Sequence, residues 1–274
     1  MMSLRRPPRS RGYTLVEVLI AMTLTGIVVA GMLKALTAQK KFYARQSRIL
    51  DARHAMRASA TILASELREL SASGGDIYAL APDSIALRST VAFGIVCNVD
   101  LAGGRLSLTH TTGHFRLEGE DSVLVFVEGS SVFDDDSWRT LPATGITMFG
   151  PSCSSGRAPD RVVSLSGNLS GVTVGSPVRI FRPYIYGLFQ LNDRWWLGRR
   201  GRAAGSSYVP VAGPLAPPAD QGLVLTYQDS LGVPTADRSE VARVEIKIRA
   251  PTYRSLTDPD YRELLTSAFL RNDG

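Results

Sequence analysis

The feature that most constrains this chain is an apolar segment of membrane length that follows a basic leader. Residues 15–36 read LVEVLIAMTLTGIVVAGMLKAL and contain one acidic side chain, Glu17, near their start. A helix of about 20 residues, rising about 1.5 Å per residue, crosses the hydrocarbon core of a bilayer. A charged side chain there costs about 2.5–3.5 kcal/mol at the bilayer centre and less toward an interface. A simple anchor gains nothing from such a residue, whereas a subunit that must leave the membrane and align with a neighbour has a use for it.

The residues around Glu17 form a specific pattern. Residues 12–19, GYTLVEVL, resemble the processing and assembly signal of type IV prepilins and type II secretion pseudopilins. In that family a membrane aspartic peptidase, the prepilin peptidase, cuts after the glycine and methylates the new amino terminus. The resemblance places the cut between Gly12 and Tyr13, so that Tyr13 becomes the N-methylated first residue. The family usually has phenylalanine where Tyr13 stands, and tyrosine keeps the ring.

The physical chemistry of the pattern agrees with that expectation. Gly12 has no side chain, so a protease can approach the backbone closely. Cutting there exposes a positive amine on Tyr13, four residues before Glu17. A lone carboxylate in hydrocarbon must find a partner or be neutralised, and the amine of a neighbouring subunit is such a partner. Glu17 is therefore expected to favour docking in one register during assembly.

The amino terminus has three other interpretations. An ordinary secretory signal also begins with basic residues, but its apolar region is shorter and precedes a small-x-small cleavage site. A twin-arginine export signal would use Arg5 and Arg6, but the hydrophobic context after this pair does not fit. A plain single-pass anchor keeps open an alternative function, that of a membrane-anchored envelope binding protein or enzyme whose N-terminus is an uncleaved anchor.

The net charge of the chain lies partly in its leader. The 274 residues carry a net charge of +6, and removal of residues 1–12 with their four arginines lowers it to +2. Basic residues beside a membrane span stay on the cytoplasmic side, which orients the rest of the chain outward. The body of the chain shows no arginine-rich run interleaved with aromatic residues, so we expect no nucleic acid to be bound directly.

The chain has two cysteines, Cys97 and Cys153, both in the part expected outside the cytoplasm. A disulfide can form in such a compartment. It would close a loop of 56 residues, worth about 4 kcal/mol on the chain-entropy account. Two free buried thiols are the alternative. The spacing suits neither a zinc site nor a C-x-x-C redox motif.

One long helix is expected at the amino terminus. No proline occurs between Pro8 and Pro82, and residues 13–70 read as a single helix that residues 71–76, SASGGD, bring to an end. In its first part the small residues Gly26, Ala30 and Gly31 allow close helix approach in lipid. In its second part apolar residues recur at three- and four-residue steps, which predicts packing against a sheet. This apolar stripe consists of Ile49, Ala52, Met56, Ala60, Leu63, Leu67 and Leu70.

Beyond residue 76 the pattern changes to alternation and β-branched residues, which predicts strands. The expected strands are residues 84–89, 92–99, 105–111, 122–127, 161–165, 178–181, 184–191, 195–199, 222–227 and 241–249, with a hairpin turn at Asn192 and Asp193. Residues 211–222 read as a proline-rich loop, and residues 261–265 as the one place for a short helix in the body of the chain. The fold class is therefore α+β and pilin-like, a long helix packed on an antiparallel sheet that is either continuous or split.

This division predicts four regions along the chain. They are a cleaved leader 1–12, a transmembrane and assembly helix 13–36, its amphipathic continuation 37–73 and a β-rich head 74–274.

More loosely, the order of elements resembles the W-type minor pilins and the J-type pseudopilins of type II secretion. The matching segments are residues 62–68, the hairpin 184–187 with 196–200, the late strand 241–249 and a terminal strand ending at residues 269–272. The resemblance implies a non-enzymatic subunit at or near a filament tip, held first in the inner membrane with its head outside the cytoplasm. Its partners would be the prepilin peptidase, other minor and major pilins or pseudopilins, and the inner-membrane assembly platform.

No catalytic, cofactor or metal site is expected. His110 and His114 lack a third ligand nearby in the sequence, and His54 lies among arginines on the helix. Residues 134–137, DDDS, lack the spacing of a calcium loop and read better as an acidic turn. The aromatic pairs Tyr184 with Tyr186 and Trp195 with Trp196 either contact a partner or supply core on one side and an edge on the other.

Overall fold

The structure, a computed structural model, describes residues 13–117, 121–129, 137–252 and 260–271. The chain divides into two compact parts, one ending at Asp51 and the other beginning at Ala52. Helix α1, Leu15–Arg68, runs through both parts without interruption. The predicted helix, residues 13–70, is thus confirmed to within two residues at each end.

The second part of α1 supplies the apolar face that the sequence predicts. Its buried side chains are Ala52, Ala55, Met56, Ser59, Ala60, Leu63, Ala64 and Leu67. They recur at three- and four-residue steps, so they share one side of the helix. Ile49, the first residue of the predicted stripe, is half-buried.

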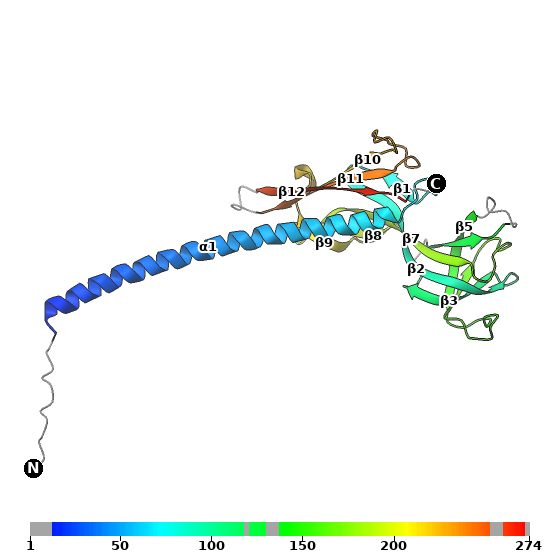
Figure 1. The fold of residues 1–274 in the computed structure, drawn as a ribbon, viewed down its shortest axis with the longest axis horizontal. Helices are drawn as coiled ribbons and strands as arrows, with labels where there is room; N and C mark the ends of the chain where they lie inside the picture. Colours follow the sequence, from blue (N-terminus) through cyan, green and yellow to red (C-terminus); the bar gives the residue numbers. More distant parts are fainter. Residues whose placement is uncertain (1–12, 118–120, 130–136, 253–259, 272–274) are drawn as a thin grey trace, which may run out of the picture. The chain divides into compact units, whose positions relative to one another are not determined.

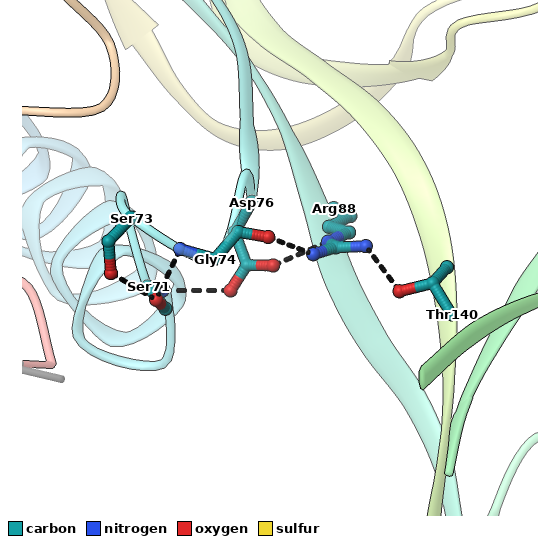
Figure 2. Close-up of polar contacts among 6 residues, drawn as sticks. All are labelled: Ser71, Ser73, Gly74, Asp76, Arg88 and Thr140. Atoms are coloured by element: carbon teal, nitrogen blue, oxygen red, sulfur yellow. Dashed lines mark hydrogen bonds and ion pairs between the residues drawn. The ribbon is translucent and has the colours of Figure 1, made fainter. Parts of the chain in front are cut away.

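The turn after α1 is held by its own polar side chains. Asp76 Oδ2 accepts a hydrogen bond from the Ser71 backbone N–H at 2.8 Å, and Ser71 Oγ accepts one from Gly74 N–H, also at 2.8 Å (Figure 2). Gly75 adopts a φ of 74°, a left-handed conformation that glycine reaches without strain. The predicted helix end at residues 71–76 is confirmed.

Two antiparallel sheets follow (Figure 1). Among the described residues the larger sheet has nine strands, in the order β1-β2-β3-β6-β5-β4-β7-β8-β9. They are β1 Ile77–Leu80, β2 Ser84–Asp100, β3 Arg105–Gly113, β4 Ser122–Val127, β5 Ser137–Thr147, β6 Arg161–Leu165, β7 Pro177–Leu191, β8 Arg194–Gly201 and β9 Val209–Leu215. The smaller sheet consists of β10 Leu223–Gln228, β11 Arg243–Pro251 and β12 Tyr261–Phe269, and a short 3-10 helix, Pro218–Asp220, precedes it.

The larger sheet closes on itself over part of its length. Strand β2 pairs with β3 on one side and with β7 on the other. The strands β2, β3, β6, β5, β4 and β7 therefore form a closed barrel, which leaves no free sheet edge within the ring. We call this ring the barrel lobe.

The part of the chain beginning at Ala52 contains two hydrophobic cores. In the barrel lobe the core residues include Val96, Leu106, Val125 and Ile180. In the other lobe, which we call the sandwich lobe, α1 packs against side chains from the smaller sheet and from the β1, β8 and β9 end of the larger one. Leu63, fully buried in this second core, packs there with side chains from both sheets. The fold class predicted from the sequence is confirmed.

Two buried ion pairs connect different elements of the head. Arg88 on β2 binds Asp76 in the turn after α1, donates to Gly74 O at 2.7 Å and reaches Thr140 Oγ1 on β5 at 3.5 Å (Figure 2). Arg182 on β7 binds Asp121, which immediately precedes β4. The first pair connects the barrel lobe to the turn after α1, and the second connects two neighbouring segments within the barrel lobe.

Several strand predictions need correction. The segments predicted as 84–89 and 92–99 are one strand, β2, with a register shift between Thr90 and Ala92 where the prediction was interrupted. The segments 178–181 and 184–191 are likewise one strand, β7. Pro183 stands where the β4 pairing has ended and the β8 pairing has not begun, so its missing N–H removes no hydrogen bond there.

Three strands were not predicted from the sequence: β1, β5 and β9. Strand β12 ends at Phe269, where the resemblance implied a terminal strand. Strand β9 overlaps the start of the predicted proline-rich loop, and as an edge strand it accommodates Pro210 and Pro214. The short helix expected at residues 261–265 is wrong, because this segment pairs along β11 as β12. The hairpin turn is confirmed: Leu191 pairs with Arg194, and Asn192 and Asp193 have φ values of 50° and 58°, as a two-residue turn of type I′ requires.

Candidate assembly site at the amino terminus

Helix α1 begins with a reciprocal pair of hydrogen bonds between Thr14 and Glu17. The Thr14 hydroxyl accepts a hydrogen bond from the Glu17 backbone N–H at 3.3 Å. Glu17 Oε2 accepts one from the Thr14 backbone N–H at 3.1 Å and one from its hydroxyl at 3.3 Å. This is a capping box, in which two backbone donors without helical partners are satisfied by side chains. The T-x-x-E spacing that signals it was visible in the sequence and was overlooked.

The location of Glu17 also favours a negative charge. It lies in the first turn of α1, where the partial positive charge of the helix dipole stabilises an anion. Tyr13, Glu17, Ala21 and Thr25 follow one another at four-residue steps and line one side of the helix. Tyr13, which is 86% exposed, thus lies beside the Glu17 carboxylate, which we expect to favour docking during assembly. Gly12, the other residue of the predicted processing site, lies outside the described residues.

The apolar side chains at the start of α1 are exposed. Leu15, Met22, Ile27 and Leu33 are each more than half exposed. Among the described residues α1 is a single helix long and apolar enough to cross a membrane, with a mean hydropathy of 2.2 and none of its most apolar window buried. Such a surface needs lipid or other helices around it.

The polar groups in this segment are satisfied within the helix. Thr23, Thr25 and Thr37 donate their hydroxyls to backbone carbonyls three or four residues earlier, at 2.7–3.0 Å. A hydroxyl bonded in this way needs no water, which suits a lipid environment. Side chains at Gly26 and Gly31 would meet nothing within 4 Å, so both glycines leave space for another helix to approach.

The head carries one disulfide among its described residues. Cys97 on β2 and Cys153 in the segment between β5 and β6 are bonded, with their Cα atoms 4.8 Å apart. Two further hydrogen bonds hold the same segment, from Asn98 Nδ2 to Ser152 O at 2.6 Å and from Ser107 Oγ to Pro151 O at 2.8 Å. The bridge therefore fastens a long connection to the wall of the barrel lobe.

The other sequence candidates occupy different places. Tyr186 is fully buried in the sandwich core, while Tyr184, Trp195 and Trp196 are half-buried. Burial raises the pKa of Tyr186 to about 12, with a further contribution from the nearby negative charge of Glu66. The described residues contain no group of three histidine, cysteine or acidic side chains arranged to hold a metal, and residues 134–136 lie outside the described part.

Folding brings together arginine and aromatic residues that are separate in the sequence, while the expectation that the chain binds no nucleic acid directly stays a prediction. Arg199, Arg200 and Arg202 are close together in the sequence, and each guanidinium lies over a tyrosine ring. Two of these rings belong to Tyr78 and Tyr208. Tyr78 is far from the three arginines in the sequence, and Tyr208 lies in the connection that follows them. Only folding brings the aromatic partners together, so the linear search did not detect the cluster.

Comparison with known proteins identifies the amino-terminal segment. The prokaryotic N-terminal methylation motif matches residues 7–33. This match supports a type IV pilin-like protein anchored in a membrane by its N-terminal helix. No curated protein and no solved structure matches the chain.

Proposed function

We propose that this protein is a non-enzymatic minor pilin or pseudopilin subunit that initiates or caps assembly of a type IV pilus or a related filament. The observation that carries the proposal is the methylation motif at residues 7–33, which coincides with a capped and uncovered apolar helix. A helix of this kind serves first as a membrane anchor and then as the packing surface among subunits.

The proposed maturation follows from the motif. The prepilin peptidase removes residues 1–12 between Gly12 and Tyr13 and methylates Tyr13. Residues 13–36 then span the inner membrane, residues 37–73 continue the helix, and residues 74–274 form the head outside the cytoplasm. The disulfide between Cys97 and Cys153 supports this orientation, because disulfides persist mainly outside the reducing cytoplasm.

Glu17 has two roles in this proposal. It caps its own helix through Thr14, using Oε2. A carboxylate offers about four acceptor positions, so Glu17 retains the capacity to accept the methylated ammonium group of a neighbouring subunit. That second interaction favours one register between subunits and offsets the penalty of a buried charge.

Two substitutions separate these roles. Glu17→Gln keeps a side chain that can complete the capping box but removes the negative charge. Thr14→Ala removes the cap and keeps the charge. We expect the Glu17→Gln protein to be cleaved yet absent from purified filaments, and the Thr14→Ala protein to enter them. Normal incorporation of Glu17→Gln would refute the charge pairing.

The amino terminus of the wild-type protein gives an independent test. Mass spectrometry of membrane and filament fractions should find a chain that begins with N-methyltyrosine. A chain that keeps its leader would refute the proposed maturation and would leave the membrane-anchored binding protein as the better interpretation.

A further inference from the structure

The head contains a basic cleft of about 930 Å³ between its two lobes. Its walls come from β2, the residues after β3, β7, β8 and the connection from β8 to β9. The charged and titratable residues among those that line it are His114, Arg116, Arg182, Arg199, Arg200 and Arg202. The residues that line the cleft include no aspartate or glutamate.

Some of these positive charges are already compensated. Arg182 is bound to Asp121, and Arg199 is influenced by the negative charge of Glu66. Arg116, Arg200 and Arg202 take part in none of the ion pairs formed among the described residues. Three guanidinium groups in one concave site thus have no carboxylate bound to them within the described part of the head.

Two of these guanidinium groups are held in place by aromatic rings. Arg200 lies over Tyr208, 5.3 Å from the ring centroid, and Arg202 lies over Tyr78 at 4.7 Å. A guanidinium that is already positioned loses less conformational entropy when it binds an oxyanion. The lining also contains hydroxyl donors from Thr90, Ser206 and Ser207. The cleft therefore presents many donors to a ligand rich in oxyanions.

We propose that this cleft binds an acidic peptide segment of another protein. Planar guanidinium groups pair with carboxylates through two parallel hydrogen bonds. A volume of about 930 Å³ is far larger than one oxyanion needs and lies near the upper end of the range of ligand pockets, which leaves room for several side chains of a peptide. This inference goes beyond the proposed function, because it requires neither cleavage of the leader nor filament assembly.

The geometry favours a peptide over a nucleic acid. Proteins that bind single strands offer aromatic faces on which bases stack. Here one side of Tyr208 is taken by Arg200, and its ring also stacks on Phe189 with centroids 5.2 Å apart. Tyr184, the aromatic residue that lines the cleft, lies under Arg199. A duplex carries its phosphates on a convex surface, which does not enter a concave site of this size.

The test uses the full chain in detergent micelles and a fluorescein-labelled hexaglutamate peptide. Fluorescence anisotropy is measured for the wild type and for a cleft variant with Arg116→Gln, Arg200→Gln and Arg202→Gln. A matched control, with Arg105→Gln, Arg157→Gln and Arg262→Gln, loses the same charge at exposed positions elsewhere on the head. We expect the cleft variant to bind at least about tenfold more weakly, and the control to change less than about twofold. The leader arginines are common to all three proteins.

Two further measurements make the result decisive. Hydrogen exchange should show that the peptide protects residues 199–207, and protection confined to the leader would overturn the proposal. A variant with lysine at the three cleft positions tests the fold and the geometry together, because it keeps the charge but loses the bidentate contact. We expect its affinity to lie between those of the wild type and the glutamine variant.

Other results would also overturn the proposal. Equal weakening in the cleft variant and the control would show attraction by net charge alone. Tighter binding of a single-stranded or duplex oligonucleotide, lost in the cleft variant, would identify the cleft as a nucleic-acid site instead.

Discussion

Arg182 and Asp121 meet through two parallel hydrogen bonds, from Nε to Oδ1 and from Nη2 to Oδ2, each 2.8 Å long. Both side chains are almost fully buried. The guanidinium also donates to Arg116 O at 2.6 Å, and its hydrogen bond to Asp121 is the largest cause that raises the pKa of Arg182 above its ordinary value. The pair thus anchors the chain before β4 to the middle of β7.

Breaking this pair on one side should be strongly destabilising. We expect Asp121→Ala or Arg182→Leu to lower the free energy of unfolding by about 3–5 kcal/mol, because each leaves a buried charge without its partner. The double variant should lose less than the sum of the two single losses, since no isolated charge remains. Denaturant unfolding of the full chain in micelles measures all three, and strict additivity would argue against a direct coupling.

The packing of α1 in the sandwich lobe can be tested at Leu63. This side chain is fully buried, so Leu63→Ala should cost about 2–5 kcal/mol through lost burial and the cavity left behind. Leu265→Ala is a suitable control because Leu265 is 65% exposed, and its effect should stay within about 0.5 kcal/mol. Comparable losses at the two positions in thermal unfolding would contradict the described core.

The hydroxyl of Tyr186 is buried close to Glu66, Ser89 and Arg199, but it forms no hydrogen bond of regular geometry among the described residues. Tyr186→Phe should therefore leave the free energy of unfolding at neutral pH unchanged or slightly higher. The folded state raises the pKa of this hydroxyl from 10.0 to about 12. Its neutral form favours folding below pH 10, and this contribution is lost as the pH rises from about 10 to about 12.

The same variant should accordingly lose less stability than the wild type across that alkaline range. Unfolding curves at pH 9, 10 and 11 in parallel measure the difference, for which Tyr208→Phe is a control at a half-buried ring. An identical alkaline loss in the Tyr186→Phe and wild-type proteins would show that other groups cause it.

Removal of the disulfide should destabilise the barrel lobe. The bridge between Cys97 and Cys153 closes a loop of 56 residues, and its loss is expected to cost about 2–5 kcal/mol. The paired variant Cys97→Ser and Cys153→Ser avoids a stray thiol. Hydrogen exchange should rise first in the segment between β5 and β6, and faster exchange confined to the smaller sheet would contradict the expected local effect.

The capping box predicts a local effect at the start of α1. Thr14→Ala should weaken the first turn by about 0.5–2 kcal/mol, seen as faster amide exchange at residues 15–18 in micelles. Glu17→Gln should preserve most of the protection, since glutamine can also complete the box. Faster exchange in Glu17→Gln but not in Thr14→Ala would show that the carboxylate charge, not the hydrogen bonds, holds this turn.

Local sequence patterns were sufficient to predict those features whose conformation depends only on residues close together in the chain. The helix stripe, strands β4 and β6, and the turn at Asn192 and Asp193 follow from periodicity and turn chemistry alone. The capping box was equally readable, because Thr14 and Glu17 stand at the required spacing.

The remaining features depend on contacts between distant segments. Closure of the barrel lobe rests on β2 pairing with β7, whose partners are about 90 residues apart, and no local pattern encodes such a pairing. Arg88 and Arg182 resemble surface charges in the sequence, and only their partners Asp76 and Asp121 allow them to be buried. The basic cleft is hidden for the same reason, since its arginines come from separate strands and loops.

Strands β2 and β7 pass from one hydrophobic core into the other, with Leu87 and Tyr186 in the sandwich core and Val96 and Val178 in the barrel core. The lobes are thus joined by two shared strands, and tilting one lobe against the other would shear the main-chain hydrogen bonds between β2 and β7, whose pairing runs on both sides of one register shift. A force applied to the head is therefore transmitted through β2 and β7, which both lobes share. The two lobes should unfold together under force.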